Sequence, residues 1–166
     1  MAINTNTNLA GLTTAQISEL TSAELALITV PQAIGFTTNQ LVALTTKQAP
    51  FLTSNIISAL SSVQVVAIET KDLELLTSLA ISALNANAIA ALTTQQIAAL
   101  NTSQVASLNS SALQVLSTKQ ISAMEARDIA VLSTTNLVSL NSLQLQALTT
   151  LQIEGLTESQ IASLSS

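Results

Sequence analysis

The sequence predicts an all-helical solenoid made of about twenty repeats of eight residues. Three observations predict it: an apolar residue at every eighth position, a helix-capping residue directly after it, and a second apolar residue five positions on. The repeats form a single array over residues 12–166, after a short lead-in at residues 1–11. Leu164, Ser165 and Ser166 open a further octad and no polar capping helix follows, so we expect a piece of a longer array.

Two apolar series run through the array without insertion, and we number each octad from the first of them. Position 1 is occupied by Leu12, Leu20, Ile28, Phe36, Leu44, Leu52, Leu60, Ile68, Leu76, Leu84, Leu92, Leu100, Leu108, Leu116, Met124, Leu132, Leu140, Leu148, Leu156 and Leu164. Position 6 is occupied by Ile17, Leu25, Ala33, Leu41, Ala49, Ile57, Val65, Leu73, Ile81, Ile89, Ile97, Val105, Leu113, Ile121, Ile129, Leu137, Leu145, Ile153 and Ile161. The consensus octad is LTTxQIAA, and both series are expected to form the core.

Position 2 predicts the start of a helix in each octad. It holds Thr, Ser or Asn in nearly every copy, with Glu69 and Glu125 as exceptions, and these polar side chains accept hydrogen bonds from the free N–H groups of a first helical turn. Gln or an acid follows three residues later in most copies, as in the pair Thr13 and Gln16, which is the spacing of a capping box. Each octad therefore predicts a short capped helix, which is stable only when it stacks on its neighbours.

A β-solenoid is the alternative fold, because Thr, Ile and Val favour strands. The apolar spacings of five and three are both odd, however, and would place successive core residues on opposite faces of a strand. Ala, Gln and Leu are good helix formers, which also favours helices. In the helical register Pro31 falls at the second helical position, where it is tolerated, whereas Pro50 falls late in its octad and should weaken that turn.

The number of octads in one coil is indicated by longer spacings. Larger residues at position 8 (Leu27, Phe51 and Leu75) recur at every third octad, which favours about three octads per coil. The strongest long-range echo is at seven octads, where ETKDLEL from Glu69 matches EARDIAV from Glu125. Seven octads fit neither two nor three per coil evenly, so the coil need not close on a whole number of octads.

The composition argues against several classes of function. The chain has no His and no Cys, so it lacks the commonest general base and any thiolate metal site. The net charge of −5 opposes phosphate binding, and no apolar run approaches the roughly 20 residues of a membrane span. The first residues, MAINTNTNLAGL, have no Lys or Arg and no long apolar block, so we expect no secretory signal peptide there; a signal elsewhere in a longer parent chain stays open. We therefore expect no enzyme, no catalytic residues, no cofactor, no metal site, no nucleic-acid partner and no membrane insertion.

Two octads carry most of the charge, and they are the only clusters that resemble a site: Glu69, Lys71, Asp72 and Glu74 in one, and Glu125, Arg127 and Asp128 in the other. Calcium requires six or more oxygen ligands, which neither cluster offers. We expect solvated local ion pairs at helix starts. All four basic residues (Lys47, Lys71, Lys119 and Arg127) occupy the variable position 4, which is therefore predicted to be exposed.

The phrase LTTxQIAAL, over residues 12–166, resembles repeat arrays of very large repetitive bacterial proteins that are described as adhesin-like or surface-associated. This resemblance implies a structural spacer, stalk or scaffold region, extracellular or at the cell surface. Its partners would be neighbouring repeats of the same chain, with cell-surface or matrix molecules beyond them. The alternative is a solenoid that binds a peptide, a glycan or ice.

A second resemblance concerns VQVVAIE at residues 63–69, which is similar to the first helix of transcription-activator-like effector repeats. That family binds DNA through basic two-helix units. The second helix, the base-reading loop and the positive charge are missing here, so DNA binding is not expected.

Overall fold

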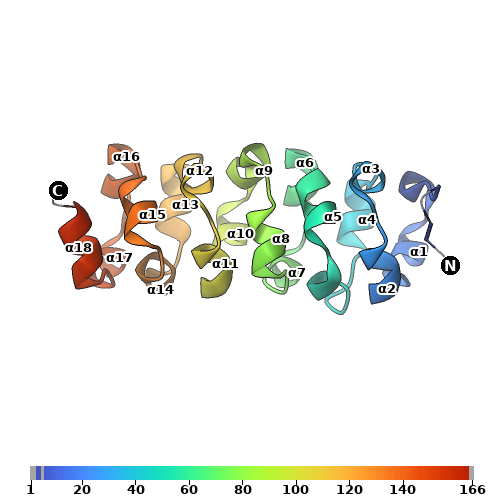
Figure 1. Cartoon of the computed structure of the whole chain (residues 1–166), viewed down its shortest axis with the longest axis horizontal. Coiled ribbons are helices and arrows are strands. Elements are labelled where there is room, and N and C mark those ends of the chain that lie inside the picture. Colours follow the sequence, from blue (N-terminus) through green and yellow to red (C-terminus); the bar gives the residue numbers. More distant parts are fainter. Residues whose placement is uncertain (1–2, 5, 165–166) are drawn as a thin grey trace.

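The chain is a helical solenoid, as the octad pattern predicts. The computed structural model describes residues 3–4 and 6–164, and within them it contains short helices and no strands (Figure 1). The elements are η1 (Leu9–Gly11), α1 (Thr14–Ser18), α2 (Ser22–Ala26), α3 (Val30–Ala33), α4 (Thr38–Val42), η2 (Ala49–Phe51), α5 (Ser54–Ala59), α6 (Ser62–Val66), α7 (Thr70–Leu73), α8 (Ser78–Ser82), α9 (Ala86–Ala91), α10 (Thr94–Ala98), α11 (Thr102–Ala106), α12 (Ser110–Gln114), α13 (Thr118–Ala123), α14 (Ala126–Ala130), α15 (Thr134–Val138), α16 (Ser142–Gln146), α17 (Thr150–Glu154) and α18 (Glu158–Leu164). Ser165 and Ser166, which the sequence places in a further octad, lie outside the described residues.

Position 2 starts the helices, as predicted. In α10 the hydroxyl of Thr93 accepts a hydrogen bond from the backbone N–H of Gln96 at 3.1 Å, and the side-chain oxygen of Gln96 accepts one from the N–H of Thr93 at 3.0 Å. This reciprocal pair is a capping box, and it satisfies two N–H groups that have no partner inside the helix. Thr93 itself is extended, with φ −68° and ψ 159°, so each cap also turns the chain into its next helix.

No described residue has a positive φ, so the chain turns between helices without the left-handed conformation. Ala99, directly after α10, is right-handed, and position 1 is extended where Leu60 and Met124 follow α5 and α13 directly. Glycine is therefore not needed at the corners, which agrees with a sequence that contains only three glycines.

Successive coils stack along one axis, with the N-terminus at one end and the C-terminus at the other (Figure 1). Each helix packs against the helix that lies three octads further on, as α6 does on α9 and α10 on α13. The rows of stacked helices are staggered, because the chain does not return to the same corner after a whole number of octads. The helix contacts agree with about three octads per coil, and the hydrogen bonds between coils give the number more closely.

The core is made of the two apolar series. Ile97 and Leu100 show the pattern, with 0% and 2% of their surface exposed, and the same positions are buried through most of the array. At the C-terminal end Ile153 and Ile161, which also occupy position 6, are 51% and 52% exposed. Position 6 is therefore covered by the following coil and not within its own octad.

The two prolines affect their helices differently. Pro31 is in the first turn of α3, and Pro50 falls in η2, a 3₁₀ turn that replaces the α-helix of its octad. Pro lacks the N–H of a helical residue, so the weakening predicted for this octad is confirmed.

No helix among the described residues is long and apolar enough to cross a membrane.

Candidate functional site

Position 5 carries side chains that form hydrogen bonds both within their own octad and to the preceding coil, as Gln104 shows. Its side-chain oxygen accepts from the N–H of Asn101 at 2.9 Å, which is the local capping contact. Its Nε2 donates to the carbonyl oxygens of Leu73 at 2.9 Å and Leu76 at 2.7 Å, which lie 31 and 28 residues earlier in the chain. One fully buried amide therefore caps its own helix and holds the preceding coil.

The same double contact, which we call the glutamine clamp, recurs along the array. In each clamp Nε2 lies 2.6–2.9 Å from the carbonyl oxygen 28 residues back and also donates to the carbonyl 31 residues back. The clamp residues are buried, and they are Gln40, Gln48, Gln96, Gln104, Gln120, Gln144, Gln152 and Gln160. These bonds add to the apolar contacts between coils and to a smaller number of other polar contacts, such as Ser107 Oγ to Ser78 O at 3.1 Å.

The clamp spacing gives the coil its length. A repeat of 28 residues is three and a half octads, so the chain returns to the same octad position only after two coils. Two coils therefore contain seven octads, which is the interval of the internal echo between Glu69 and Glu125. The echo joins octads that occupy the same corner of the solenoid.

Glutamine suits this position because the clamp needs an acceptor, a donor and sufficient length. Asn136, which is shorter by one methylene, reaches only the carbonyl of Leu108, at 2.8 Å. The clamp was missed from sequence because Gln at this position was explained by capping alone. A signal was present: eleven octads have Gln at position 5 and only one has Glu (Glu24), although a capping box accepts either residue.

The two charged octads are only partly as expected. Lys71 pairs with Glu69 and Arg127 with Glu125, each at 2.6 Å, with the side chains exposed to solvent. The expectation of solvated acids is wrong for the two aspartates, because Asp72 and Asp128 occupy position 5 and are 2% and 0% exposed. Both carboxylate oxygens of Asp72 and Oδ1 of Asp128 are buried without a hydrogen-bond partner, and burial raises the pKa of both side chains.

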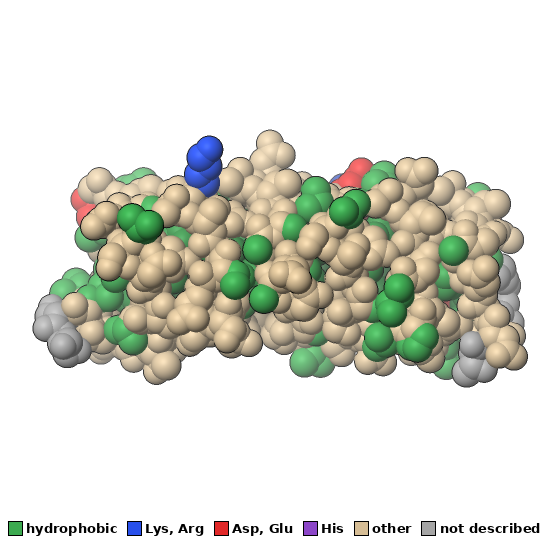
Figure 2. Space-filling model, turned by 90° about the horizontal axis from the view of Figure 1, so that it is seen from above, with side chains coloured by type: hydrophobic (Ala, Val, Ile, Leu, Met, Phe, Trp, Pro, Cys, Tyr) green, Lys and Arg blue, Asp and Glu red, His purple; other side chains and the backbone are tan. Residues whose placement is uncertain are grey.

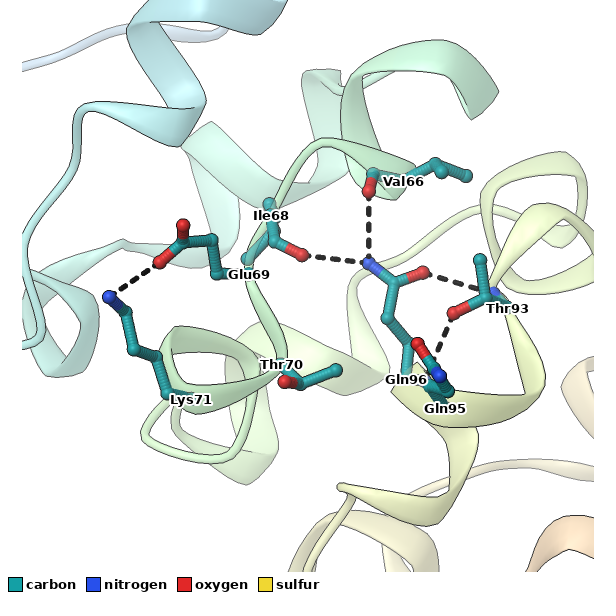
Figure 3. Close-up of a pocket in the computed structure, with 8 residues that line it drawn as sticks. All are labelled: Val66, Ile68, Glu69, Thr70, Lys71, Thr93, Gln95 and Gln96. Atoms are coloured by element: carbon teal, nitrogen blue, oxygen red, sulfur yellow. Dashed lines mark hydrogen bonds and ion pairs between the residues drawn. The ribbon is translucent and has the colours of Figure 1, made fainter.

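An open hollow lies beside the first charged octad, between α7 and α10 (Figure 3). It has a volume of about 410 Å³, and Glu69, Lys71, Thr93 and Gln96 contribute its polar groups. Lys71 is paired with Glu69, and Gln96 is paired with Thr93 and with carbonyls of the preceding coil, including Val66 and Ile68. Glu69, Lys71, Thr93 and Gln96 are thus engaged in structural contacts, whereas Thr70 and Gln95 line the hollow as further polar side chains.

A second hollow, of about 400 Å³, is mostly apolar and lies over η2, where Phe51 and Leu79 are 50% and 70% exposed. Among the described residues no group of three or more His, Cys, Asp or Glu side chains could hold a metal ion.

Position 4 is exposed at all four basic residues, as predicted: Lys47, Lys71, Lys119 and Arg127. The same position carries the exposed side chains of Val63, Leu79, Leu143 and Leu151 in other octads. The face drawn in Figure 2 is mostly uncharged polar groups and backbone, with small scattered apolar side chains and few charges. Position 4 therefore carries both charged and apolar side chains along the array and does not present one chemistry.

Two segments of the chain, residues 65–102 and 121–158, match the family model described as the ALTTAQ repeat. The chain contains a repeat array similar to ALTTAQ repeats. The two matched segments begin seven octads apart, at Val65 and Ile121, so the ALTTAQ matches follow the two-coil interval of the glutamine clamps. Comparison with curated proteins gave no match.

Proposed function

We propose that this array is a structural spacer or scaffold region of a large bacterial surface or secreted protein, and that it performs no catalysis. A spacer needs equivalent units, a length that changes by whole units, and firm contact between units. The clamp carries the proposal, because it repeats the same two hydrogen bonds between coils from Gln40 to Gln160.

The surface also supports a spacer. Charged residues make up only 8% of the chain, and the exposed charged side chains of Glu69, Lys71, Glu125 and Arg127 are paired within their own octads. A surface of neutral hydroxyl and amide groups gives little long-range attraction to charged partners. We propose the extracellular setting on the resemblance to adhesin-like arrays, with cell-surface or matrix molecules as candidate partners.

Deletion of three whole octads, residues 93–116, tests the spacer. Because every octad presents the same core and clamp positions, the shortened chain should keep its helical circular dichroism per residue and unfold cooperatively. Its maximum dimension in small-angle X-ray scattering should decrease. The matched control removes residues 93–112, which joins position 1 to position 6 and should disrupt the helices on both sides of the deletion.

Loss of folding after the whole-octad deletion would contradict equivalence of the units. Retention of folding in both variants would show that the octad register does not control stacking.

A ligand-binding solenoid is the second candidate, and the apolar hollow at Phe51 and Leu79 favours a peptide with apolar side chains as its ligand. Peptide arrays probed with the whole chain and with Phe51→Ser test it. Peptides that bind the wild-type chain but not the Phe51→Ser variant would support binding at this hollow. Equal binding signals for the two proteins would contradict a peptide site there.

A further inference from the structure

Two octads replace the clamp glutamine with aspartate, and this substitution removes the donor between coils. By register, Asp72 lies opposite the carbonyls of Leu41 and Leu44 in the preceding coil, just as Gln96 lies opposite those of Val65 and Ile68. Asp128 lies opposite the carbonyls of Ile97 and Leu100 by the same register. Both sites therefore bring a carboxyl group toward oxygen acceptors where other octads place an amide N–H.

The side chain of aspartate is long enough to reach the nearer carbonyl. Asn136 has the same length at the same octad position, and its Nδ2 donates to Leu108 O, 28 residues back, at 2.8 Å. In Asp128 one oxygen, Oδ2, accepts from the N–H of Glu125 at 3.1 Å, as the clamp oxygen does elsewhere. The other oxygen, Oδ1, is the atom without a partner, and it corresponds to the amide nitrogen of the clamp.

Nearby charges do not neutralise these carboxylates. The neighbouring cations, Lys71 and Arg127, are exposed and paired with Glu69 and Glu125. For Asp72, the packed helix α10 has no titratable side chain. The octad of η2 in the preceding coil contributes only the exposed Lys47, and Glu74 is exposed on the octad of Asp72 itself.

For Asp128, the packed helices are α11, which has no titratable side chain, and α17, which contributes only the exposed Glu154. An ionised carboxylate at either site would face carbonyl dipoles of the same sign without a compensating donor.

We propose that Asp72 and Asp128 are held as neutral carboxylic acids whose O–H groups donate to the carbonyl oxygens of Leu44 and Leu100, so that each forms a proton-dependent clamp between coils. The proton takes the place of the amide hydrogen that glutamine supplies in the other clamps. Because the two aspartates are seven octads apart, they occupy the same corner of the solenoid two coils apart. The array thus contains two equivalent contacts between coils, and each loses its hydrogen bond when its aspartic acid ionises.

The direction of the pH dependence follows from linkage. Desolvation by burial raises the pKa of both aspartates in the folded chain above the ordinary value of an aspartate. Stability from the protonated clamps is therefore fully present below the unfolded pKa and is lost as pH rises through the raised folded pKa. Within that window the unfolding equilibrium constant should rise by up to about tenfold per pH unit for each aspartate.

Titration of the wild type and of Asp72→Asn, Asp128→Asn and the double variant tests the proposal. Asp72 and Asp128 are the only aspartates in the chain, so aspartate labelled with ¹³C at the carboxyl group gives two signals, which the single variants assign. Both signals should titrate above the ordinary value of about 3.9. The double variant should lose the pH-dependent part of stability, because asparagine donates to the carbonyl at every pH, as Asn136 does.

Glu74→Gln is the matched control, because it removes an exposed acid from the octad of Asp72 and leaves both clamp aspartates and the Lys71–Glu69 pair in place. It should keep the wild-type pH dependence. Carboxyl signals that titrate at or below about 3.9 would overturn the proposal. So would a double variant with the pH dependence of the wild type, or neutral-pH stability that rises with added K⁺ or Na⁺ only when both aspartates are present, since a metal cation would then occupy the site.

Discussion

Gln104 offers the most direct measurement of what a clamp contributes to stability. Gln104→Glu keeps the shape and the oxygen that accepts from Asn101, but it replaces the Nε2 donor with a second oxygen. Gln104→Ala removes both functions. The two variants therefore separate the loss of hydrogen bonds from the burial of a charge opposite the carbonyls of Leu73 and Leu76.

The expected magnitudes follow from the contacts. A typical intramolecular hydrogen bond contributes about 0.5–1.5 kcal/mol, so losing the two shortest Nε2 bonds in Gln104→Ala should cost about 1–3 kcal/mol. Gln104→Glu should cost about 3–5 kcal/mol at neutral pH, because the side chain is fully buried and leaves a charge uncompensated. Acidification should recover part of the second loss, since a neutral acid donates one bond to the preceding coil.

Guanidinium unfolding followed by far-ultraviolet circular dichroism gives the free energy of unfolding, and hydrogen exchange in α11 locates the loss. Gln95→Ala is the matched control, because Gln95 is exposed at position 4 of the neighbouring octad and should be neutral within about 0.5 kcal/mol. A cost for Gln104→Glu no greater than that of Gln95→Ala would refute the clamp, and equal costs for the Ala and Glu variants at all pH values would refute the charge argument.

Two further substitutions test the caps and the core. Thr93→Ala removes the cap acceptor of α10 and should cost about 0.5–2 kcal/mol in chemical unfolding; a loss equal to that of Gln95→Ala would show that the assigned helix start is wrong. Ile97→Ala should cost about 2–5 kcal/mol because this core residue is fully buried. The same change at Ile161, which is 52% exposed at the equivalent position, should cost much less in the same assay; similar losses at both would contradict burial of position 6 by the following coil.

The local structure of each octad could be predicted from sequence because its determinants lie within a few residues. The cap at Thr93 and its box partner Gln96 are three residues apart, and the helix start follows from that pair alone. The burial of Ile97 and the exposure of Lys119 follow from the same register. The sequence also predicted the tolerance of Pro31 and the weakened turn at Pro50.

The contacts between coils were decided only by the tertiary structure. A strict period of eight says where each helix begins, but the number of octads per coil depends on the angle between successive helices, and no local pattern encodes that angle. The resulting return after 28 residues places Gln104 under the carbonyls of Leu73 and Leu76 and gives it a second role. The same return buries Asp72 and Asp128, which resemble solvated helix-start acids in sequence, because their octad position faces the preceding coil.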